Sequence, residues 1–198
     1  MKKNTTLTLL FLLLVIPLTT TAQQSDKDAA IARIRKAYNA AVANAKMIEK
    51  DKVTMTKNGC WGPENSRTAI DFYYTLEAVE DADMVIEKLN LVRETQKGTY
   101  TTYYQEFLFD PETETLLFNL VVSDNKNESI KVERRTYFGV NEDGTTYTEV
   151  KVIDKKTGKD VTSKYSENIG LLMDDGFMVR YGHNLVNAFS NIMLRGWD

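Results

Sequence analysis

One segment restricts the possible folds of this chain more than any other: residues 98–122, with the sequence GTYTTYYQEFLFDPETETLLFNLVV. It contains two runs rich in aromatic, β-branched and threonine residues, a composition typical of strands. Between the runs stands Asp110-Pro111-Glu112-Thr113, in which the proline presets the first bend of a turn and has no backbone donor for a sheet. The segment therefore predicts a β-hairpin, and every other element must pack beside it or across it.

The N-terminus has the three-part pattern of a secretory signal peptide. Two lysines precede an apolar run over residues 7–18, and small residues follow up to Ala22. The apolar run is shorter than the roughly 20 residues that span a bilayer. We expect cleavage near Ala22, which divides the chain into a signal peptide, 1–22, and a single domain, 23–198. The mature protein is expected to be periplasmic or secreted, soluble, and without a membrane span.

Composition argues against some classes of function. The chain has a net charge of −3, and its arginine pair, Arg134-Arg135, is flanked by Glu128 and Glu133. A nucleic-acid-binding protein needs a concentrated basic face, so we expect no nucleic-acid partner. Cys60 is the only cysteine in the sequence, which excludes an internal disulfide and leaves stability to packing. A domain of this length buries enough surface for one core.

Alternation of polar and apolar residues predicts further strands on both sides of the hairpin. The expected strands, about seven in all, cover residues 52–56, 67–78, 84–94, 100–109, 114–122, 130–138 and 145–154. The strand 84–94 is ambiguous, because its apolar residues would also suit a helix. Polar turns at 123–127, 141–144 and 156–158 separate the later strands, which indicates an antiparallel meander.

Helical spacing of apolar residues predicts one helix before the strands and one after them. After the expected cleavage site, residues 25–28 supply N-cap candidates, and an amphipathic, alanine-rich stripe continues to Ile48. Residues 174–195 carry the most apolar stripe of the chain, from Phe177 to Met193. We therefore expect an α+β fold, in which a curved antiparallel sheet packs against an N-terminal and a C-terminal helix.

One motif suggests a thiol enzyme. In the segment 58–62, NGCWG, Cys60 stands between a glycine and a tryptophan, and His183 lies downstream as a possible general base. This segment resembles the surroundings of the nucleophile in papain-like cysteine proteases, which implies acyl transfer by Cys60. Pro63 and a strand follow where that family has a long helix, and the family's oxyanion glutamine has no counterpart just before Cys60. The alternative is a partly buried cysteine in a loop pinned by Trp61.

The patterns of metal and cofactor sites are missing from the sequence. His183 has no histidine or glutamate at the helical spacing of a zinc site. Turn residues such as Asp124 and Glu128 could bind calcium through oxygen, but they do not fit the twelve-residue calcium loop with its central glycine. The pair Gly158-Lys159 lacks the first glycine of a phosphate-binding loop. We therefore expect no cofactor and no metal.

Tyrosines on the more polar side of several strands form the candidate binding surface. Tyr73, Tyr103 and Tyr137 fall there, together with Arg135. Such side chains anchor protein and glycan recognition, because they combine a large rigid area with polar atoms. Aligned registers would make them an open face of the sheet away from the helices, and the loop with Trp61 offers a second contact. The alternative is ordinary cross-strand pairing that stabilises the sheet.

An antiparallel sheet framed by two helices resembles the architecture of the cystatin-like and helix-grip families. That resemblance implies binding, either as an inhibitor or through a pocket between helix and sheet, although fold alone does not carry function across. We therefore expect a secreted or periplasmic, non-catalytic binding protein with a protein or glycan partner in the cell envelope. Two alternatives remain: a carrier of an apolar ligand between the C-terminal helix and the sheet, and a thiol hydrolase that uses Cys60 and His183.

Overall fold

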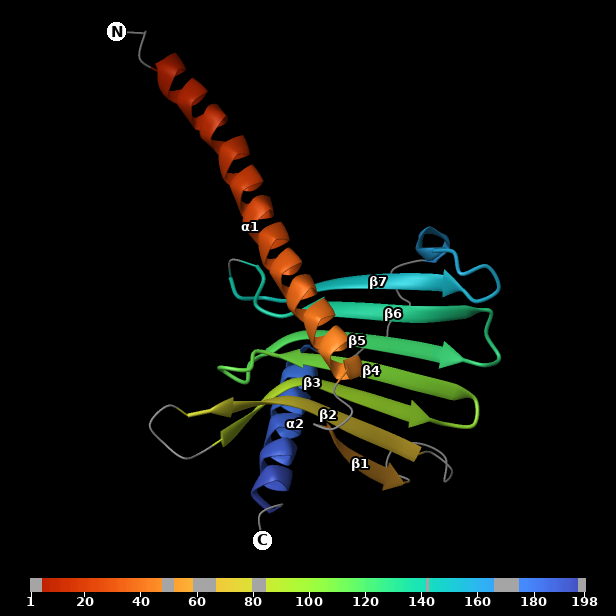
Figure 1. The fold of residues 1–198 in the computed structure, drawn as a ribbon. Helices are drawn as coiled ribbons and strands as arrows, with labels where there is room; N and C mark the ends of the chain where they lie inside the picture. The colour runs from red at the N-terminus through yellow and green to blue at the C-terminus, as the bar shows by residue number, and fades with distance from the viewer. Residues whose placement is uncertain are drawn as a thin grey trace.

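A single antiparallel sheet with a helix at each end of the chain forms the fold (Figure 1). The computed structural model describes residues 5–47, 52–58, 67–79, 85–141, 143–165 and 175–195. The elements are α1 (Thr5–Met47), β1 (Lys52–Asn58), β2 (Arg67–Ala78), β3 (Val85–Lys97), β4 (Thr101–Phe109), β5 (Leu116–Asn125), β6 (Ile130–Tyr137), β7 (Tyr147–Asp154), the 3-10 helix η1 (Thr162–Lys164) and α2 (Asp175–Arg195). The strands lie in chain order from β1 to β7, and each neighbouring pair is antiparallel. The expected α+β class, with an antiparallel sheet and two terminal helices, is confirmed.

The predicted hairpin lies at the centre of the sheet as β4 and β5, and this prediction is confirmed. Its turn is held by Asp110, whose carboxylate accepts the backbone N–H groups of Glu112 at 2.8 Å and Thr113 at 3.2 Å. Pro111, between them, has no N–H to satisfy, so the local sequence matches the geometry of the turn.

The ambiguous segment around residues 84–94 is a strand, β3, and a bulge explains its mixed spacing. Tyr73 pairs with Leu91 while the next residue, Tyr74, pairs with Leu89, so Asn90 is the extra residue. A bulge reverses the alternation of side chains along a strand. Leu89 and Val92 therefore both join the core beneath α2, a three-residue spacing that imitates a helix.

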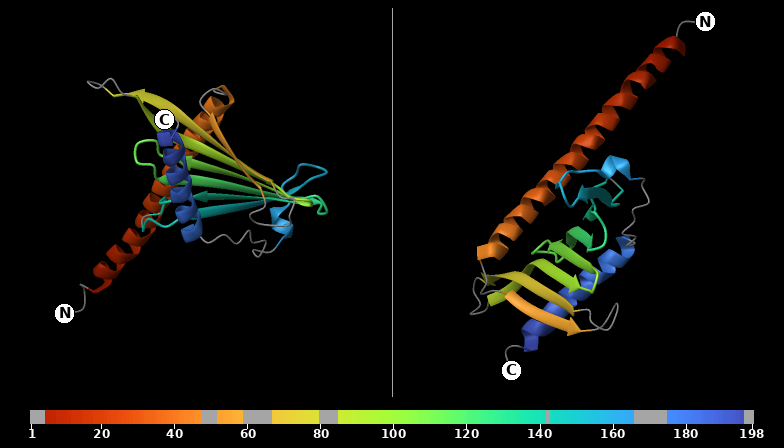
Figure 2. Two further views of the ribbon diagram at one scale, coloured as in Figure 1. Left: turned by 90° about the horizontal axis from the view of Figure 1, so that it is seen from below. Right: turned by 90° about the vertical axis from the view of Figure 1, so that its right-hand side faces the viewer.

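The two helices cover opposite faces of the sheet (Figure 2). On β4, Phe107 and Phe109 belong to the core cluster that contains α2, whereas Leu108 belongs to the cluster that contains Ile31 of α1. Successive strand residues point to opposite faces, so the two clusters lie on the two sides of one sheet. The expectation of one face free of helices is therefore wrong.

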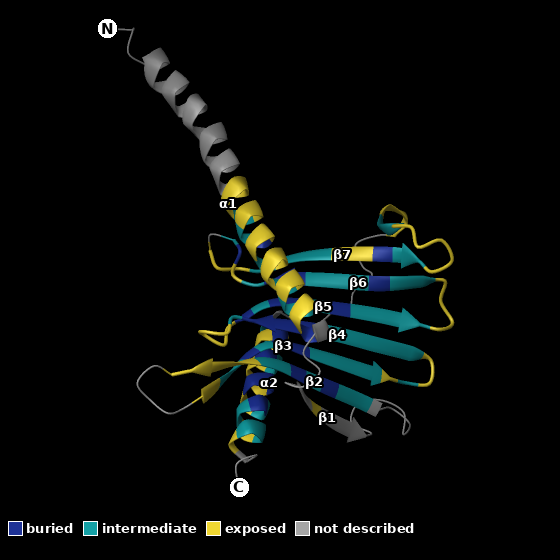
Figure 3. Cartoon of the chain, viewed as in Figure 1, coloured by how far each residue is buried: buried dark blue, intermediate teal, exposed yellow. Residues whose placement is uncertain are grey.

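The α2 side is the larger of the two cores. Buried aromatic and aliphatic side chains of β2 to β5 meet the apolar stripe of α2, including Phe72, Phe107, Phe109, Met178, Leu185 and Phe189. The helix lies so close that a Cβ added at Gly182 would approach Leu116 Cδ2 to 3.1 Å. Apart from Phe177, which is exposed, the apolar stripe that the sequence predicts for α2 is the surface that the helix buries (Figure 3).

The N-terminal helix begins earlier than expected. A start at residues 25–28 is wrong for the full chain, because α1 runs without a break from Thr5. The predicted N-cap residues Ser25, Asp26 and Asp28 lie inside α1 and do not cap it. Asp28 instead accepts a hydrogen bond from the Gln24 amide at 3.0 Å, a pairing of residues four apart on the helix surface. Within the described parts of the chain, neither helix is long and apolar enough to cross a bilayer.

The packing of α2 generates a stability prediction. Phe189 is buried against Phe72 and Tyr74, with ring centroids 6.0 Å and 5.4 Å away. Phe189→Ala should lower the free energy of unfolding by about 3–5 kcal/mol, because it removes apolar contacts and leaves a cavity. Leu194→Ala on the same helix, at a side chain that is 75% exposed, should change it by less than about 0.5 kcal/mol. Chemical denaturation of both variants measures the difference, and similar losses would contradict the packing described.

Candidate functional site

The face of the sheet beneath α1 carries a row of charged side chains. Cross-strand pairing aligns Arg93 of β3 with Glu106 of β4, then Leu120 of β5, Arg135 of β6 and Glu149 of β7. Because each is the direct partner of the next, all five project from the same face. The row places two arginines and two glutamates under or beside α1, in a sheet whose other face is mainly apolar.

Glu106 is the most buried charged residue of this row, with 3% of its surface exposed. Arg93 Nε donates to its Oε1 at 2.7 Å, and the Tyr104 hydroxyl donates to the same oxygen. The Tyr38 hydroxyl of α1 donates to the second oxygen, Oε2. We call these four residues the Glu106 cluster. Both carboxylate oxygens have partners, which is the condition under which a buried charge is tolerated.

The Glu106 cluster shifts the pKa values of its members. Burial raises the pKa of the Tyr38 and Tyr104 hydroxyls well above their ordinary value of 10.0, and the hydrogen bonds to Glu106 raise it further. Burial lowers the pKa of Arg93, but the hydrogen bond to Glu106 and the charge of Glu106, with smaller contributions from Tyr104 and Tyr73, together outweigh burial and raise this pKa. At neutral pH the cluster therefore holds a guanidinium and two neutral phenols around the side chain of Glu106.

A second arginine, Arg35 of α1, reaches down to the sheet. Its Nε donates to the Tyr137 hydroxyl at 2.9 Å, and its Nη2 lies 2.7 Å and 3.0 Å from the two oxygens of Glu149. The Tyr137 hydrogen bond is the main cause that raises the pKa of Arg35, and Glu149 adds to it. Arg35 thus ties α1 to β6 and β7, as Tyr38 ties it to β4.

Between these two ties lies a cavity of about 190 Å³, which we call the cleft. Its lining residues are Arg35, Tyr38, Asn39, Phe118, Leu120, Arg135 and Tyr137. Phe118, Leu120 and the ring of Tyr137 are apolar surface, whereas Arg35, Asn39 and Arg135 bring hydrogen-bond donors. A cavity with mainly apolar surface and a few convergent polar groups is the usual form of a small-molecule site.

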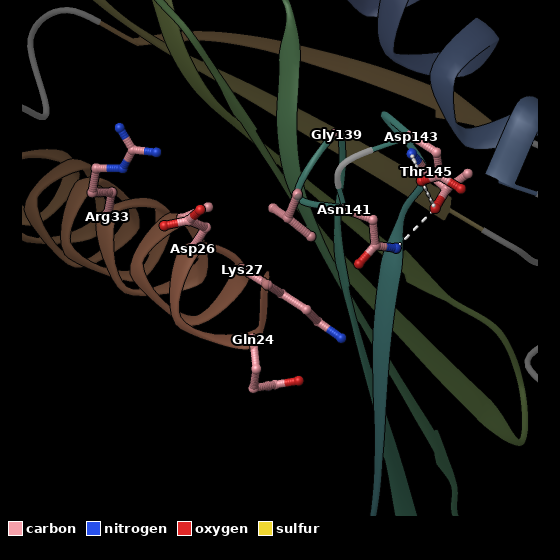
Figure 4. Close-up of a pocket in the computed structure, with 10 residues that line it drawn as sticks. Gln24, Asp26, Lys27, Arg33, Gly139, Asn141, Asp143 and Thr145 are labelled. Atoms are coloured by element: carbon pink, nitrogen blue, oxygen red, sulfur yellow. Dashed lines mark hydrogen bonds between the residues drawn. The ribbon is translucent and has the colours of Figure 1, made fainter. Parts of the chain in front are cut away.

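Among the residues that the structure describes, two other hollows adjoin α1. A shallow groove of about 770 Å³ lies between α1 and residues 139–145 (Figure 4). The polar groups on its sheet side hold the neighbouring turn: the Asn141 amide and the Asp143 carboxylate both bond to the Thr145 hydroxyl, at 2.8 Å and 2.6 Å. The other hollow, about 280 Å³, lies on the alanine-rich flank of α1 beside Tyr73. The cleft differs from both in that two arginines, Arg35 and Arg135, line it together with Phe118 and Leu120.

The structure brings together only part of the predicted binding surface. Tyr73, Arg135 and Tyr137 share the α1 face, where Arg135 and Tyr137 line the cleft. Tyr73 lies further along the same face, with the Arg93 guanidinium 5.2 Å from its ring centre. Tyr103 is on the opposite face, because its odd position in β4 matches that of Phe107. Tyr137 is also 1% exposed, so it belongs to the core rather than to an open surface.

The residues of the predicted thiol site are only partly described. Cys60 and Trp61 lie outside the described residues, so the predictions on both stay untested. His183 lies on the exposed side of α2 and borders a separate cavity of about 190 Å³ with Phe109 and Leu116. The described residues include no group of three or more histidines, cysteines or acids placed to hold a metal ion.

Sequence reasoning missed the residues that build the site. Arg35 stood among the polar residues of the first helix, and nothing in the helical pattern distinguished it from its exposed neighbours. Glu106 carried a usable signal: an acidic residue in the middle of a strand otherwise aromatic and aliphatic, with Arg93 on the preceding strand. A charge at such a position needs a partner when the strand is central in a sheet.

Comparisons with protein-family models, with curated proteins and with solved structures found no match for this chain.

The Glu106 cluster generates a stability prediction. Glu106→Gln should lower the free energy of unfolding by roughly 3 kcal/mol, because it leaves the Arg93 charge without its buried partner. Glu112→Gln makes the same change at a side chain that is 68% exposed and pairs with Lys88 at 2.6 Å, and its effect should be small. Denaturant unfolding of both variants at neutral pH provides the comparison. A Glu106 variant as stable as the Glu112 variant would contradict the role of the cluster.

The raised pKa values of the phenols predict a loss of stability in alkali. Tyr181 of α2 is a third phenol with a raised pKa, because it is partly buried and its hydroxyl donates to Glu94 at 2.8 Å. Above about pH 10 the unfolded tyrosines ionise, whereas folded Tyr38, Tyr104 and Tyr181 keep their protons. The folded state then binds more protons than the unfolded state, so the free energy of unfolding falls as pH rises. Unfolding experiments between about pH 9 and pH 11 should show this fall, with a smaller slope for Tyr38→Phe. Equal slopes for the two proteins would contradict the assignment.

Proposed function

We propose that this protein is a non-catalytic binding protein of the cell envelope, periplasmic or secreted, and that its ligand binds in the cleft between α1 and the sheet. The observation that carries the proposal is the convergence of Arg35 and Arg135 on a cavity with an apolar floor. The signal-peptide pattern of residues 1–22 supports the location. The ligand would come from the same compartment, as a small molecule or as part of a protein or glycan partner.

The groups that line the cleft suit recognition better than reaction. Guanidinium and amide groups donate hydrogen bonds, and Phe118 and Leu120 offer apolar contact. The residues that line the cleft include no acid. The Glu106 carboxylate, bonded to Tyr38, has both oxygens occupied and little exposure, which leaves it poorly placed to take a proton from a ligand. These features favour binding over general-base chemistry.

The two other functions that the sequence suggests have less support. A carrier of an apolar ligand between α2 and the sheet would need space that the close approach of Gly182 to Leu116 does not provide. The cavity beside His183, with Phe109 and Leu116 in its wall, is the remaining place for such a ligand. A thiol hydrolase would require Cys60 to be alkylated at mildly acidic pH and His183 to speed that reaction.

Binding in the cleft can be tested by nuclear magnetic resonance. The full chain is expressed in its own host, and the isotope-labelled product is titrated with a size-fractionated envelope extract. We expect the backbone amide signals of Asn39, Leu120 and Arg135 to shift. Asn39→Trp should abolish the shifts, because its ring fills the cleft from α1. Lys36→Trp, an exposed position on the outer side of α1, should retain them.

Other patterns would contradict the proposal. Shifts confined to α2 and the residues around His183 would move the site to the opposite face. Identical behaviour of the Asn39 and Lys36 variants would show that the cleft is not the binding site. The intact mass of the same material reports the N-terminus, and a mass equal to that of residues 23–198 would support the predicted cleavage.

A further inference from the structure

The pairing of charges leaves Arg135 with few partners. Its cross-strand neighbour on β7 is Glu149, but both oxygens of Glu149 are engaged by Arg35. Arg135 instead makes a long contact of 3.4 Å to Glu133 on its own strand. Glu133 is closer to Lys131, at 3.0 Å, so even this acid is shared. A guanidinium has five N–H donors, and Arg135 uses one of them in this contact.

Counting the charges around the cleft gives an excess of one positive charge. Arg35, Lys131 and Arg135 are the cations, whereas Glu133 and Glu149 are the acids that pair with them. The Glu106 cluster adds no net charge to this count, because the charges of Arg93 and Glu106 cancel. An anion with a single negative charge would balance this part of the surface.

The shape of the cleft limits the ligand further. Its volume of about 190 Å³ is smaller than the roughly 300–1,000 Å³ of sites that enclose drug-sized molecules. Phe118 and Leu120 line it on the sheet side, and the Tyr38 and Phe118 rings contact each other with centroids 4.8 Å apart. The space therefore suits a short apolar group attached to the charged one.

We propose that the cleft binds a carboxylate that carries a short apolar group, with Arg135 holding the carboxylate and Phe118 and Leu120 contacting the apolar group. This inference rests on the proposed function and names the chemical class of its ligand. The fork of a guanidinium matches the two oxygens of a carboxylate. One excess positive charge suits a monoanion better than a phosphate dianion, and the apolar floor gives no partner to further phosphate oxygens. A free small acid and the C-terminus of a peptide ending in an apolar residue share this chemistry.

The test uses isovalerate, its neutral amide isovaleramide, inorganic phosphate and the peptide Gly-Gly-Leu with a free C-terminus. Each is titrated into the labelled product of the full chain, and dissociation constants are obtained from the amide signals of Asn39, Leu120 and Arg135. We expect isovalerate to bind at least about tenfold more tightly than isovaleramide, because the amide loses the charge-assisted hydrogen bonds. We expect phosphate to bind more weakly than isovalerate.

Two variants and one control connect this binding to Arg135. Arg135→Gln should weaken isovalerate binding by about tenfold or more and leave isovaleramide binding unchanged. Asn39→Asp adds a negative charge at an exposed position of the cleft. It should also weaken isovalerate binding, because the new charge repels the carboxylate. Arg180→Gln removes the same kind of charge from the exposed side of α2, on the opposite face, and should bind isovalerate like the unmodified protein.

The outcomes separate this inference from the proposed function. Tighter binding of Gly-Gly-Leu than of isovalerate would support a peptide terminus as the source, and the reverse would support a free acid. Equal binding of acid and amide, or tighter binding of phosphate, would overturn the carboxylate assignment. If no probe moves the cleft signals while the envelope extract does, the inference fails and the proposed function stands. If neither the probes nor the envelope extract moves the cleft signals, both the inference and the proposed function fail.

Discussion

The buried carboxylate of Glu106 is the interaction on which the α1 side of the structure depends. It accepts hydrogen bonds from β3, β4 and α1 through Arg93, Tyr104 and Tyr38. An unpaired charge at this depth would be costly, so each partner must stay in place while the carboxylate remains ionised. The cluster therefore sets the position of α1 over β4. The cleft lies between this contact and the second one, in which Arg35 bonds to Tyr137 of β6 and Glu149 of β7.

The two faces of the sheet are held by different forces. Beneath α2, aromatic and aliphatic side chains pack closely, and a glycine allows the helix to approach. Beneath α1, a smaller apolar cluster is combined with hydrogen bonds and ion pairs between side chains from distant parts of the chain. Polar ties of this kind fix a helix at a few points and leave space between them. This difference explains why the site that we propose lies beneath α1.

Local sequence patterns predicted much of the sheet, and their failures have physical causes. The β4–β5 hairpin follows from Asp110-Pro111 and from residues whose side chains favour strands, because both effects act within a few residues. The mixed spacing of β3 was ambiguous because a bulge at Asn90 reverses its alternation, and a bulge depends on the partner strand. The grouping of Tyr73, Tyr103 and Tyr137 failed for Tyr103, since one position along a strand changes the face.

The sequence by itself determined the α+β class, the central hairpin and the apolar stripe of α2, because alternation, turn chemistry and helical periodicity are local properties of the chain. Only the tertiary structure decided that the helices cover opposite faces and that Glu106 is buried beneath α1. It also decided that Glu149, the cross-strand neighbour of Arg135, pairs with Arg35 instead. These arrangements join residues up to 114 positions apart. They depend on strand register and on which face each helix covers, and no pattern within a short segment encodes either.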